Sequence, residues 1–194
     1  MRNEWYGDPR DFVKWGVLAA LAGESKARII VQVLMLRPDA KAAEIGDGHT
    51  AWAVRPEVYS HFRDVRNVKR LGRKLNVEIV LIDHEFEPAA RERYFAEVQG
   101  KLRAIPQRKV VLLDPDTGLA GGRLSPKHVS KTEVRTVWSA LHPGDWLVLY
   151  QHAWRQSRWR EISEARFREA CEKSAVVSYR GTAANDVALL AAKR

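Results

Sequence analysis

The sequence predicts an α/β fold with three layers, in which helices cover both faces of a mostly parallel sheet of about six strands. Three observations support this prediction. Short runs of β-branched residues and leucine alternate along the chain with longer segments of helical periodicity, a pattern typical of parallel strands joined by crossover helices. The run at residues 109–113 is apolar throughout, which indicates a strand buried on both faces. A short polar segment separates the last two runs, so we expect them to form a C-terminal antiparallel hairpin.

The individual elements follow from apolar spacing and from helix-start signals. Residues 11–22 have a broad apolar face, and apolar residues recur every three or four positions over 56–75, so we expect helices in both segments. Another helix, over 88–104, starts at a proline, whose missing N–H costs nothing there. Ser130 and Glu133 have the spacing of a capping box that opens the next helix. The other expected elements are strands at 28–36, 77–82, 109–113, 146–150, 175–179 and 187–192, a loop at 120–131 and a helix at 157–173. The layout is Rossmann-like.

Length and composition indicate a single basic domain. The 194 residues contain no repeat or linker, so we expect one domain over residues 1–194. The net charge of +9 makes nucleic acid the expected partner, because a basic surface attracts polyanions. No apolar run reaches the roughly 20 residues needed to cross a bilayer, and the first residues lack the apolar core of a secretory signal. With Cys171 as the single cysteine, we expect a cytoplasmic protein.

Polar residues follow four of the predicted strands. They are Arg37 to Asp39, Asp83 to Glu85, Asp114 to Asp116, and Tyr150 to His152. Parallel strands end at the same edge of a sheet, which is the edge where open α/β sheets bind ligands. We therefore expect these four groups to share one rim.

The two aspartates after the 109–113 strand, Asp114 and Asp116, are the leading catalytic candidates, together with His152. The aspartates could hold a divalent metal, since hard cations prefer oxygen ligands. They could instead orient a substrate amine or hydroxyl, or serve only as turn and cap residues beside Thr117 and Gly118. His152 could act as an acid, a base or a ligand, because histidine titrates near neutrality.

The segment 6–15 is a second candidate part of the site. Asp8 suits a helix N-cap and Asp11 the first helical turn, so structure alone explains both. Arg10 and Lys14 are not explained in this way, and Lys14 could point toward an anionic group near the helix start. The full set of candidate substrate-binding residues is Asp8, Arg10, Asp11, Lys14, Thr117, Gly118, Tyr150 and Gln151.

Two basic segments are candidates for a polyanion contact. Arg63, Arg66, Arg70 and Arg73 share one face of the predicted 56–75 helix, which is typical of a solvated face. The second segment alternates arginine with tryptophan, and such groups can neutralise phosphates and stack on bases. Because it directly follows the 146–150 strand and its polar end, we assign nucleic-acid binding to Arg155, Arg158, Trp159 and Arg160.

Three blocks of the chain, residues 7–14, 114–118 and 150–152, together resemble a poorly characterised family of bacterial and phage proteins. More distantly, the layout resembles Rossmann-like methyltransferases that use S-adenosylmethionine, in particular ribosomal RNA adenine methyltransferases. Those enzymes have an Asp-Lys helix near the N-terminus and an Asp-Pro-Pro-Tyr motif at a strand end. The resemblance implies that Asp114 and the backbone of Pro115 hold a target amine. Asp116 replaces the second proline, Thr117 replaces the stacking tyrosine, and the first strand lacks a glycine-rich cofactor loop.

Three functions remain open from the sequence. The first is a methyltransferase-like enzyme that acts on nucleic acid, with S-adenosylmethionine as the implied cofactor. The second is a metal-dependent nuclease or phosphodiesterase that uses Asp114 and Asp116. The third is a non-catalytic nucleic-acid-binding module on the same scaffold, with salt-sensitive binding. Neither the oligomeric state nor the substrate follows from the residues.

Overall fold

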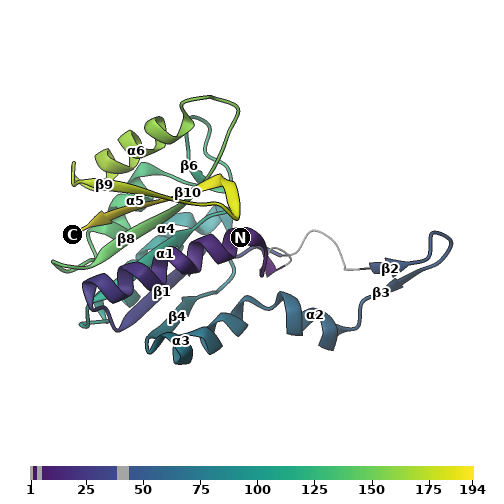
Figure 1. Cartoon of the computed structure of the whole chain (residues 1–194). Helices are drawn as coiled ribbons and strands as arrows, with labels where there is room; N and C mark the ends of the chain where they lie inside the picture. The colour runs from purple at the N-terminus through teal and green to yellow at the C-terminus, as the bar shows by residue number, and fades with distance from the viewer. Residues whose placement is uncertain (1, 4–5, 39–43) are drawn as a thin grey trace.

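A six-stranded mixed sheet forms the centre of the molecule (Figure 1). The computed structural model describes residues 2–3, 6–38 and 44–194. The strands of this sheet are β1 (Ile29–Leu34), β4 (Glu78–Ile82), β5 (Lys109–Asp114), β8 (Trp146–His152), β9 (Val176–Gly181) and β10 (Ala184–Lys193). Their order is β4-β1-β5-β8-β10-β9. Pairing is parallel from β4 to β8, and β10 runs antiparallel to both of its neighbours. The three-layer Rossmann-like prediction, including its antiparallel C-terminal pair, is confirmed.

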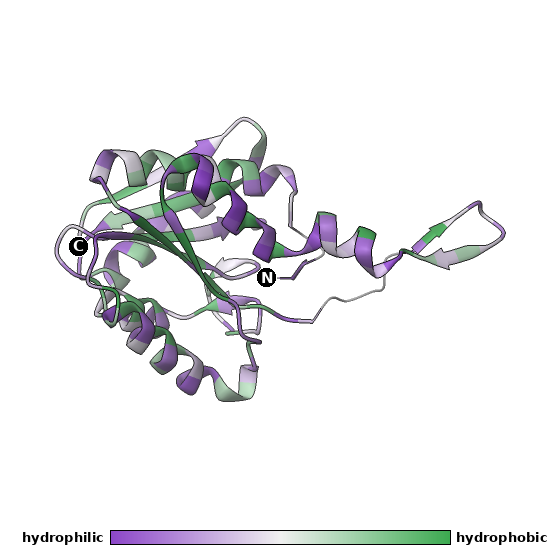
Figure 2. Cartoon of the chain, turned by 90° about the horizontal axis from the view of Figure 1, so that it is seen from below, coloured by the Kyte–Doolittle hydropathy of each residue, from purple (hydrophilic) through white to green (hydrophobic). Residues whose placement is uncertain are grey.

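Helices cover both faces of this sheet. On one face, α1 (Pro9–Ser25) and α3 (Lys69–Leu75) contribute to a core with residues such as Ile30, Leu112 and Val148. On the other face, α4 (Arg91–Arg103), α5 (Lys131–Trp138) and α6 (Trp159–Ala170) pack on residues such as Val31 and Leu113. Every residue of β1 and of β5 is buried, as the apolar runs predicted. Figure 2 shows these hydrophobic strands between helices whose surfaces are partly hydrophilic.

The predicted 56–75 helix is wrong as a single helix. The chain forms α2 (Pro56–Arg63), a 3-10 turn η2 (Val65–Val68) and then α3. The break is at Asp64, which has extended backbone angles and whose side chain accepts a hydrogen bond from the backbone N–H of Arg66. The apolar residues therefore do not form one buried stripe, and Phe62 in α2 is 65% exposed.

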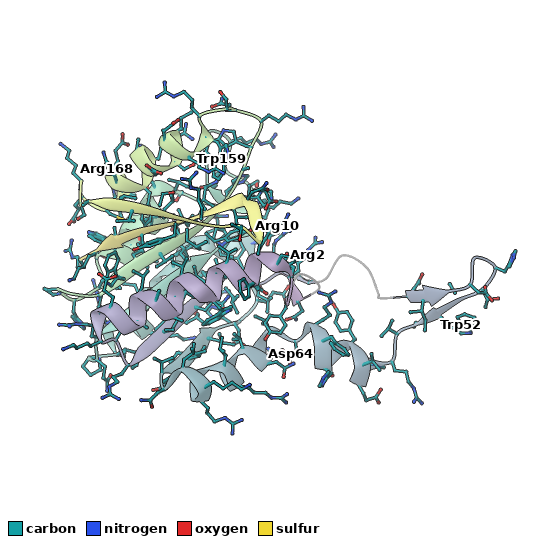
Figure 3. The ribbon with its side chains drawn as sticks, in the orientation of Figure 1. Arg2, Arg10, Trp52, Asp64, Trp159 and Arg168 are labelled. Atoms are coloured by element: carbon teal, nitrogen blue, oxygen red, sulfur yellow. The ribbon has the colours of Figure 1, made fainter. Side chains whose placement is uncertain are left out.

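A two-stranded hairpin, which the sequence analysis missed, projects away from the sheet. It consists of β2 (Glu44–Gly46) and β3 (Ala51–Ala53), and we call it the hairpin arm (Figure 1). The side chain of Asp47 organises its turn by accepting hydrogen bonds from the backbone of His49 and Thr50. Ile45 and Trp52 lie opposite each other and are 61% and 51% exposed. Figure 3 shows Trp52 on the arm, well away from the central sheet.

Three short elements precede α4 and α5. The 3-10 turn η3 (Pro88–Ala90) precedes α4. Inside the predicted 120–131 loop, β7 (His128–Val129) pairs in parallel with β6 (Gly118–Leu119). The capping box at the start of α5 is confirmed, since Ser130 accepts from the backbone of Glu133 and Glu133 accepts in return. In the part of the chain that the structure describes, no helix has the length and apolarity that a membrane span needs.

Candidate functional site

A cavity of about 330 Å³ opens at the carboxyl edge of the sheet, where β5 and β8 end beside the start of α1. Its size lies at the lower end of the range for small-molecule sites. Three of the four predicted polar strand ends contribute to it. The residues that line the cavity are Arg2, Asp8, Arg10, Asp11, Lys14, Arg37, Asp114, Pro115, Asp116, Thr117, Lys127, Tyr150 and His152.

The position of the cavity follows from the order of the strands. After β1 the chain crosses to β4 on one side, and it then returns to place β5 on the other side of β1. The order of the strands therefore reverses between β1 and β5, and open α/β sheets bind ligands at such a switch point. Arg37 follows β1 and Asp114 to Thr117 follow β5, so the cavity lies at this crevice.

The polar end of β4 is not part of the cavity. Asp83 accepts a hydrogen bond from the Nε of Arg66, at 2.8 Å, and His84 packs against the ring of Tyr94. Because β4 is the outer strand, β1 separates its end from the crevice. The expectation that all four strand ends share one rim therefore holds for three of them, with Arg37 representing the first group, since Asp39 lies outside the described residues.

The first turn of α1 forms one wall and is organised by its own carboxylates. Asp8 is the N-cap, and its side chain accepts from the backbone of Arg10 and Asp11, as the sequence predicted. Asp11 accepts from the backbone N–H of Gly7 at 2.8 Å. Free N–H groups at a helix start attract anions. Here the carboxylates of Asp8 and Asp11 already accept from the backbone N–H groups of Gly7, Arg10 and Asp11. An anion that enters the cavity must therefore be bound mainly by side chains.

Behind this wall, a buried ion cluster joins α1 to β5. The Nζ of Lys14 lies 2.8 Å from Oδ1 of Asp11 and 3.0 Å from Oδ2 of Asp114. Gln32 in β1 donates to the same Oδ2 of Asp114 at 2.7 Å. Asp114 is only 1% exposed. The carboxylate is thus held from two sides by donors on two different elements.

The electrostatics of this cluster determine what Lys14 can do. Burial alone lowers the pKa of Lys14, but the carboxylates of Asp114 and Asp11 raise it by more, and the net pKa lies above its ordinary value. Lys14 therefore stays protonated at neutral pH and cannot act as a base. Its ammonium lies 4.9 Å from the centre of the Tyr150 ring, within the range of a cation–π contact. Burial raises the pKa of Tyr150, so this phenol also keeps its proton.

At the mouth of the cavity, Arg37 forms an ion pair with Asp116. The pair connects the end of β1 to the end of β5 and so lies across the crevice. Although Arg37 contacts a carboxylate, burial and the charge of Arg2 hold the pKa of Arg37 below its usual value. Arginine nevertheless remains charged at neutral pH.

A second network of charged groups lies on the side of the cavity near β10. Arg10 donates to Asp186 at 3.2 Å from its Nε, and it also contacts Asp8. The Nε2 of His152 lies 3.2 Å from the same carboxylate, and its Nδ1 lies 3.0 Å from the carbonyl oxygen of Ala153. Burial raises the pKa of Asp186, but the Arg10 hydrogen bond, the charges of Arg10 and His152 and a backbone hydrogen bond together lower it by more, so the net direction is downward.

Two of the candidate substrate-binding residues support the site without lining it. Gln151 is fully buried, and its amide accepts from the backbone of Leu119 and donates to the carbonyl oxygen of Thr117. Gly118 has φ +120°, and a Cβ there would lie 2.4 Å from the Oε1 of Gln151. Only glycine fits this approach, so Gly118 and Gln151 fix the path of the chain after Asp116.

The basic segment after β8 differs from its prediction. Trp159 is 7% exposed and belongs to the core on the α4–α6 side, so its ring is not available to stack on a base. Figure 3 labels it at the start of α6. The guanidinium of Arg160 packs on this ring and donates to the carbonyl oxygen of Asn185. Arg155 and Arg158 are exposed, and Arg158 pairs with Glu161 in its own helix. None of the four predicted nucleic-acid-binding residues lines the cavity.

Among the described residues, no group of three or more His, Cys, Asp or Glu side chains is arranged to hold a metal ion. The two aspartates that the sequence analysis offered as ligands have different partners. Asp114 is bound by Lys14 and Asp116 by Arg37. The arrangement therefore gives no support to the predicted metal site.

Several residues of the site were not assigned to it from the sequence. Lys127 reaches the cavity because the backbone of Thr117 donates to its carbonyl oxygen, which ties the 120–131 loop to the end of β5. Asp186 lies near the start of β10, and no local pattern marks it. Arg2 lines the cavity close to Arg10, as Figure 3 shows near the start of α1. The missed residues have in common that tertiary pairing, rather than a strand end, brings them to the site.

Comparison with known proteins gives a likeness of fold. No protein-family model matches the sequence, and no curated protein matches it. An O-methyltransferase family protein from Burkholderia thailandensis has a similar solved structure, with a TM-score of 0.47 and 11% identity over 95% of this chain and 55% of that chain. A candidate methyltransferase from Thermobifida fusca gives a TM-score of 0.46 and 13% identity over 96% of this chain and 80% of that one. The chain thus spans only about half of the Burkholderia protein. Values this low carry no conclusion about activity.

Proposed function

We propose that this chain is a methyltransferase-like protein that acts on nucleic acid and holds its target group at Asp114. One observation carries the proposal. The Asp-Lys helix and the Asp-Pro strand end, the two segments in which the sequence resembles ribosomal RNA adenine methyltransferases, meet in the folded chain. The ammonium of Lys14 bonds both Asp11 in its own helix and Asp114 at the end of β5.

In this proposal Asp114 accepts a hydrogen bond from an amine or hydroxyl of the target. Lys14 and Gln32 bind the same oxygen, Oδ2, and fix the direction in which the carboxylate faces. A group held in this way needs little reorganisation when the target enters, which favours catalysis. Pro115 lines the cavity next to Asp114, and its backbone offers no N–H.

The charged groups that line the cavity fit the amino-acid end of S-adenosylmethionine, which carries an ammonium, a carboxylate and a sulfonium. Carboxylates such as Asp8 would hold the positive groups, and guanidinium groups such as Arg37 would hold the carboxylate. When bound, this cofactor would supply an electrophilic methyl group. The chain directly after β1, residues 35–38, contains no glycine. Side chains, and not the backbone of a glycine-rich loop, would therefore hold the cofactor.

Nucleic acid is the proposed substrate because of the charge distribution. The chain has a net charge of +9, and a basic protein draws in a polyanion and binds it in a salt-dependent way. The cavity itself is lined by the cations of Arg2, Arg10, Arg37, Lys127 and the buried Lys14 together with the carboxylates of Asp8, Asp11, Asp114 and Asp116. Thr117 cannot stack on a base, and Tyr150 is the aromatic side chain that lines the cavity.

The direct test is transfer of a tritiated methyl group from S-adenosylmethionine to total RNA or DNA. We expect transfer by the wild-type chain, loss of at least tenfold in Asp114→Asn, and no change in Glu92→Gln, an exposed position on α4. Calorimetric titration with S-adenosylhomocysteine gives an independent readout. Absence of both transfer and cofactor binding in the folded wild-type protein would refute the proposal.

A further inference from the structure

We propose that Arg37, supported by Arg2 and Lys127, forms an oxyanion subsite at the mouth of the cavity. The inference rests on the proposed function, because it names what the same cavity would bind at its entrance. The ligand group is a phosphate of the nucleic acid or the carboxylate of the cofactor, which present the same chemistry to a guanidinium group.

Arg37 is the first charged residue after β1, and its Nη2 contacts Asp116 at the end of β5. The side chains of Arg37 and Asp116 are only 15% and 14% exposed. The guanidinium group is therefore held across the crevice at which α/β sheets bind ligands, and it is turned toward the cavity that it lines.

The Nε of Arg37 is buried and has no hydrogen-bond acceptor among the residues that the structure describes. A buried donor without an acceptor is unfavourable, and native structures rarely keep one without a reason. Arginine presents its N–H groups as a planar fork that matches two oxygens of a phosphate or carboxylate. An oxyanion of the ligand would supply the acceptor.

Arg2 is close enough that, together with burial, its charge lowers the pKa of Arg37. Lys127 lines the same cavity from the loop between β6 and β7. Like charges that share a partly buried site are costly, and an anion that binds among them relieves the cost. Three cations from separate parts of the chain thus line one cavity.

The geometry also makes Asp116 a competitor for the ligand. Its carboxylate occupies one edge of the Arg37 guanidinium, so an incoming oxyanion must share that group or displace Asp116. Asp116→Asn removes the negative charge and keeps the size of the side chain. We therefore expect this substitution to strengthen anion binding, whereas a purely structural ion pair would give no such gain.

The test measures binding of three probes to the full chain. The probes are a fluorescein-labelled 12-nucleotide RNA, a DNA of the same length with neutral methylphosphonate linkages, and S-adenosylhomocysteine. The variants are Arg37→Met, Asp116→Asn and, as a matched control, Arg103→Met. Arg103 is exposed at the end of α4, carries the same charge and lies outside the cavity.

We expect Arg37→Met to weaken binding of the RNA by at least tenfold, to reduce its salt dependence by about one phosphate contact, and to leave the methylphosphonate DNA unaffected. Asp116→Asn should tighten RNA binding two- to fivefold. If Arg37→Met instead weakens only S-adenosylhomocysteine, the oxyanion is the cofactor carboxylate and the subsite stands. Equal behaviour of Arg37→Met and Arg103→Met with every probe, or a loss of affinity in Asp116→Asn, would overturn the subsite.

These results separate the subsite from the proposed function. A protein that transfers no methyl group but binds RNA through Arg37 would keep the subsite and refute the methyltransferase proposal. A protein that transfers methyl groups with unchanged affinity in Arg37→Met would do the reverse. Circular dichroism of each variant verifies that the fold is intact.

Discussion

Replacing Lys14 with methionine tests the buried ion cluster directly. The side chains of Lys14 and Asp114 are 4% and 2% exposed, so the substitution leaves a carboxylate in a place that water hardly reaches. Removing one partner of such a pair costs about 3–5 kcal/mol. A domain is typically stable by about 5–15 kcal/mol, so Lys14→Met should remove a large part of that stability. For a chain of this size the loss corresponds to a fall in Tm of roughly 6–20 °C.

Urea denaturation followed by far-UV circular dichroism measures this loss. Lys101→Met is the matched control, because Lys101 is exposed on α4 and its replacement should change the free energy of unfolding by less than about 0.5 kcal/mol. The double variant Lys14→Met, Asp114→Asn removes both charges, so its loss should be smaller than the sum of the two single losses by about 0.5–3 kcal/mol. A loss below about 1 kcal/mol in Lys14→Met, or strict additivity in the double variant, would show that the reasoning is wrong.

The same cluster has a defined pH dependence. The pKa of Lys14 is raised in the folded chain, so the ion pair contributes its full stability below the unfolded pKa of about 10.4. Above that pH the unfolded chain loses the proton while the folded chain keeps it, and the stability declines. The buried phenol of Tyr150, whose pKa is also raised, adds a loss in the same direction. Lys14→Met should therefore show a shallower fall in stability above about pH 10 than the wild-type protein.

Three other predictions concern positions away from the ion cluster. Burial raises the pKa of the Cys171 thiol to about 12, so at pH 8 it should react with Ellman's reagent only as fast as the chain unfolds; rapid reaction of the folded protein would contradict this burial. Gly118→Ala should destabilise the fold by about 1–3 kcal/mol because Gly118 has a left-handed φ and lies close to Gln151. Gly100→Ala in α4, where a Cβ has open space, should instead stabilise the fold by up to about 1 kcal/mol. Thermal melts give the sign of each change. Chymotrypsin should cut first after Trp52, because an isolated two-stranded hairpin is only marginally stable; mass spectrometry that finds the first cut in the central sheet would refute this.

The sequence predicted the central sheet well because its signals there are local and redundant. The β5 run is apolar on both faces and ends in Asp114-Pro115, so both its burial and its end could be read directly. The prediction of a single helix over 56–75 was wrong because the local signal there was misleading. Its apolar spacing is helical throughout, but the cap formed by Asp64 interrupts the helix and turns Phe62 toward solvent. The hairpin arm had a signal that was overlooked, since Asp47-Gly48 is a common hairpin turn.

For the site, sequence reasoning found the strand ends but not the partners that distant segments bring to them. Parallel pairing alone places Asp114 and Tyr150 on one edge, and this could be predicted. The contact of Lys14 with Asp114 depends on how α1 packs across β5, which no local pattern specifies. Trp159 is the clearest error, because alternation with arginine predicted an exposed ring and tertiary packing buried it. Asp186 reaches Arg10 because α1 packs against β10.

The place of β10 has a consequence for the order in which the chain can fold. In the central sheet, as far as the described residues show, β9 pairs only with β10, while β10 also pairs with β8. The ribosome synthesises β9 before β10, so β9 has no native partner strand until β10 has emerged. The two strands must therefore either pair with each other before they join the sheet, or β9 must wait until β10 has paired with β8.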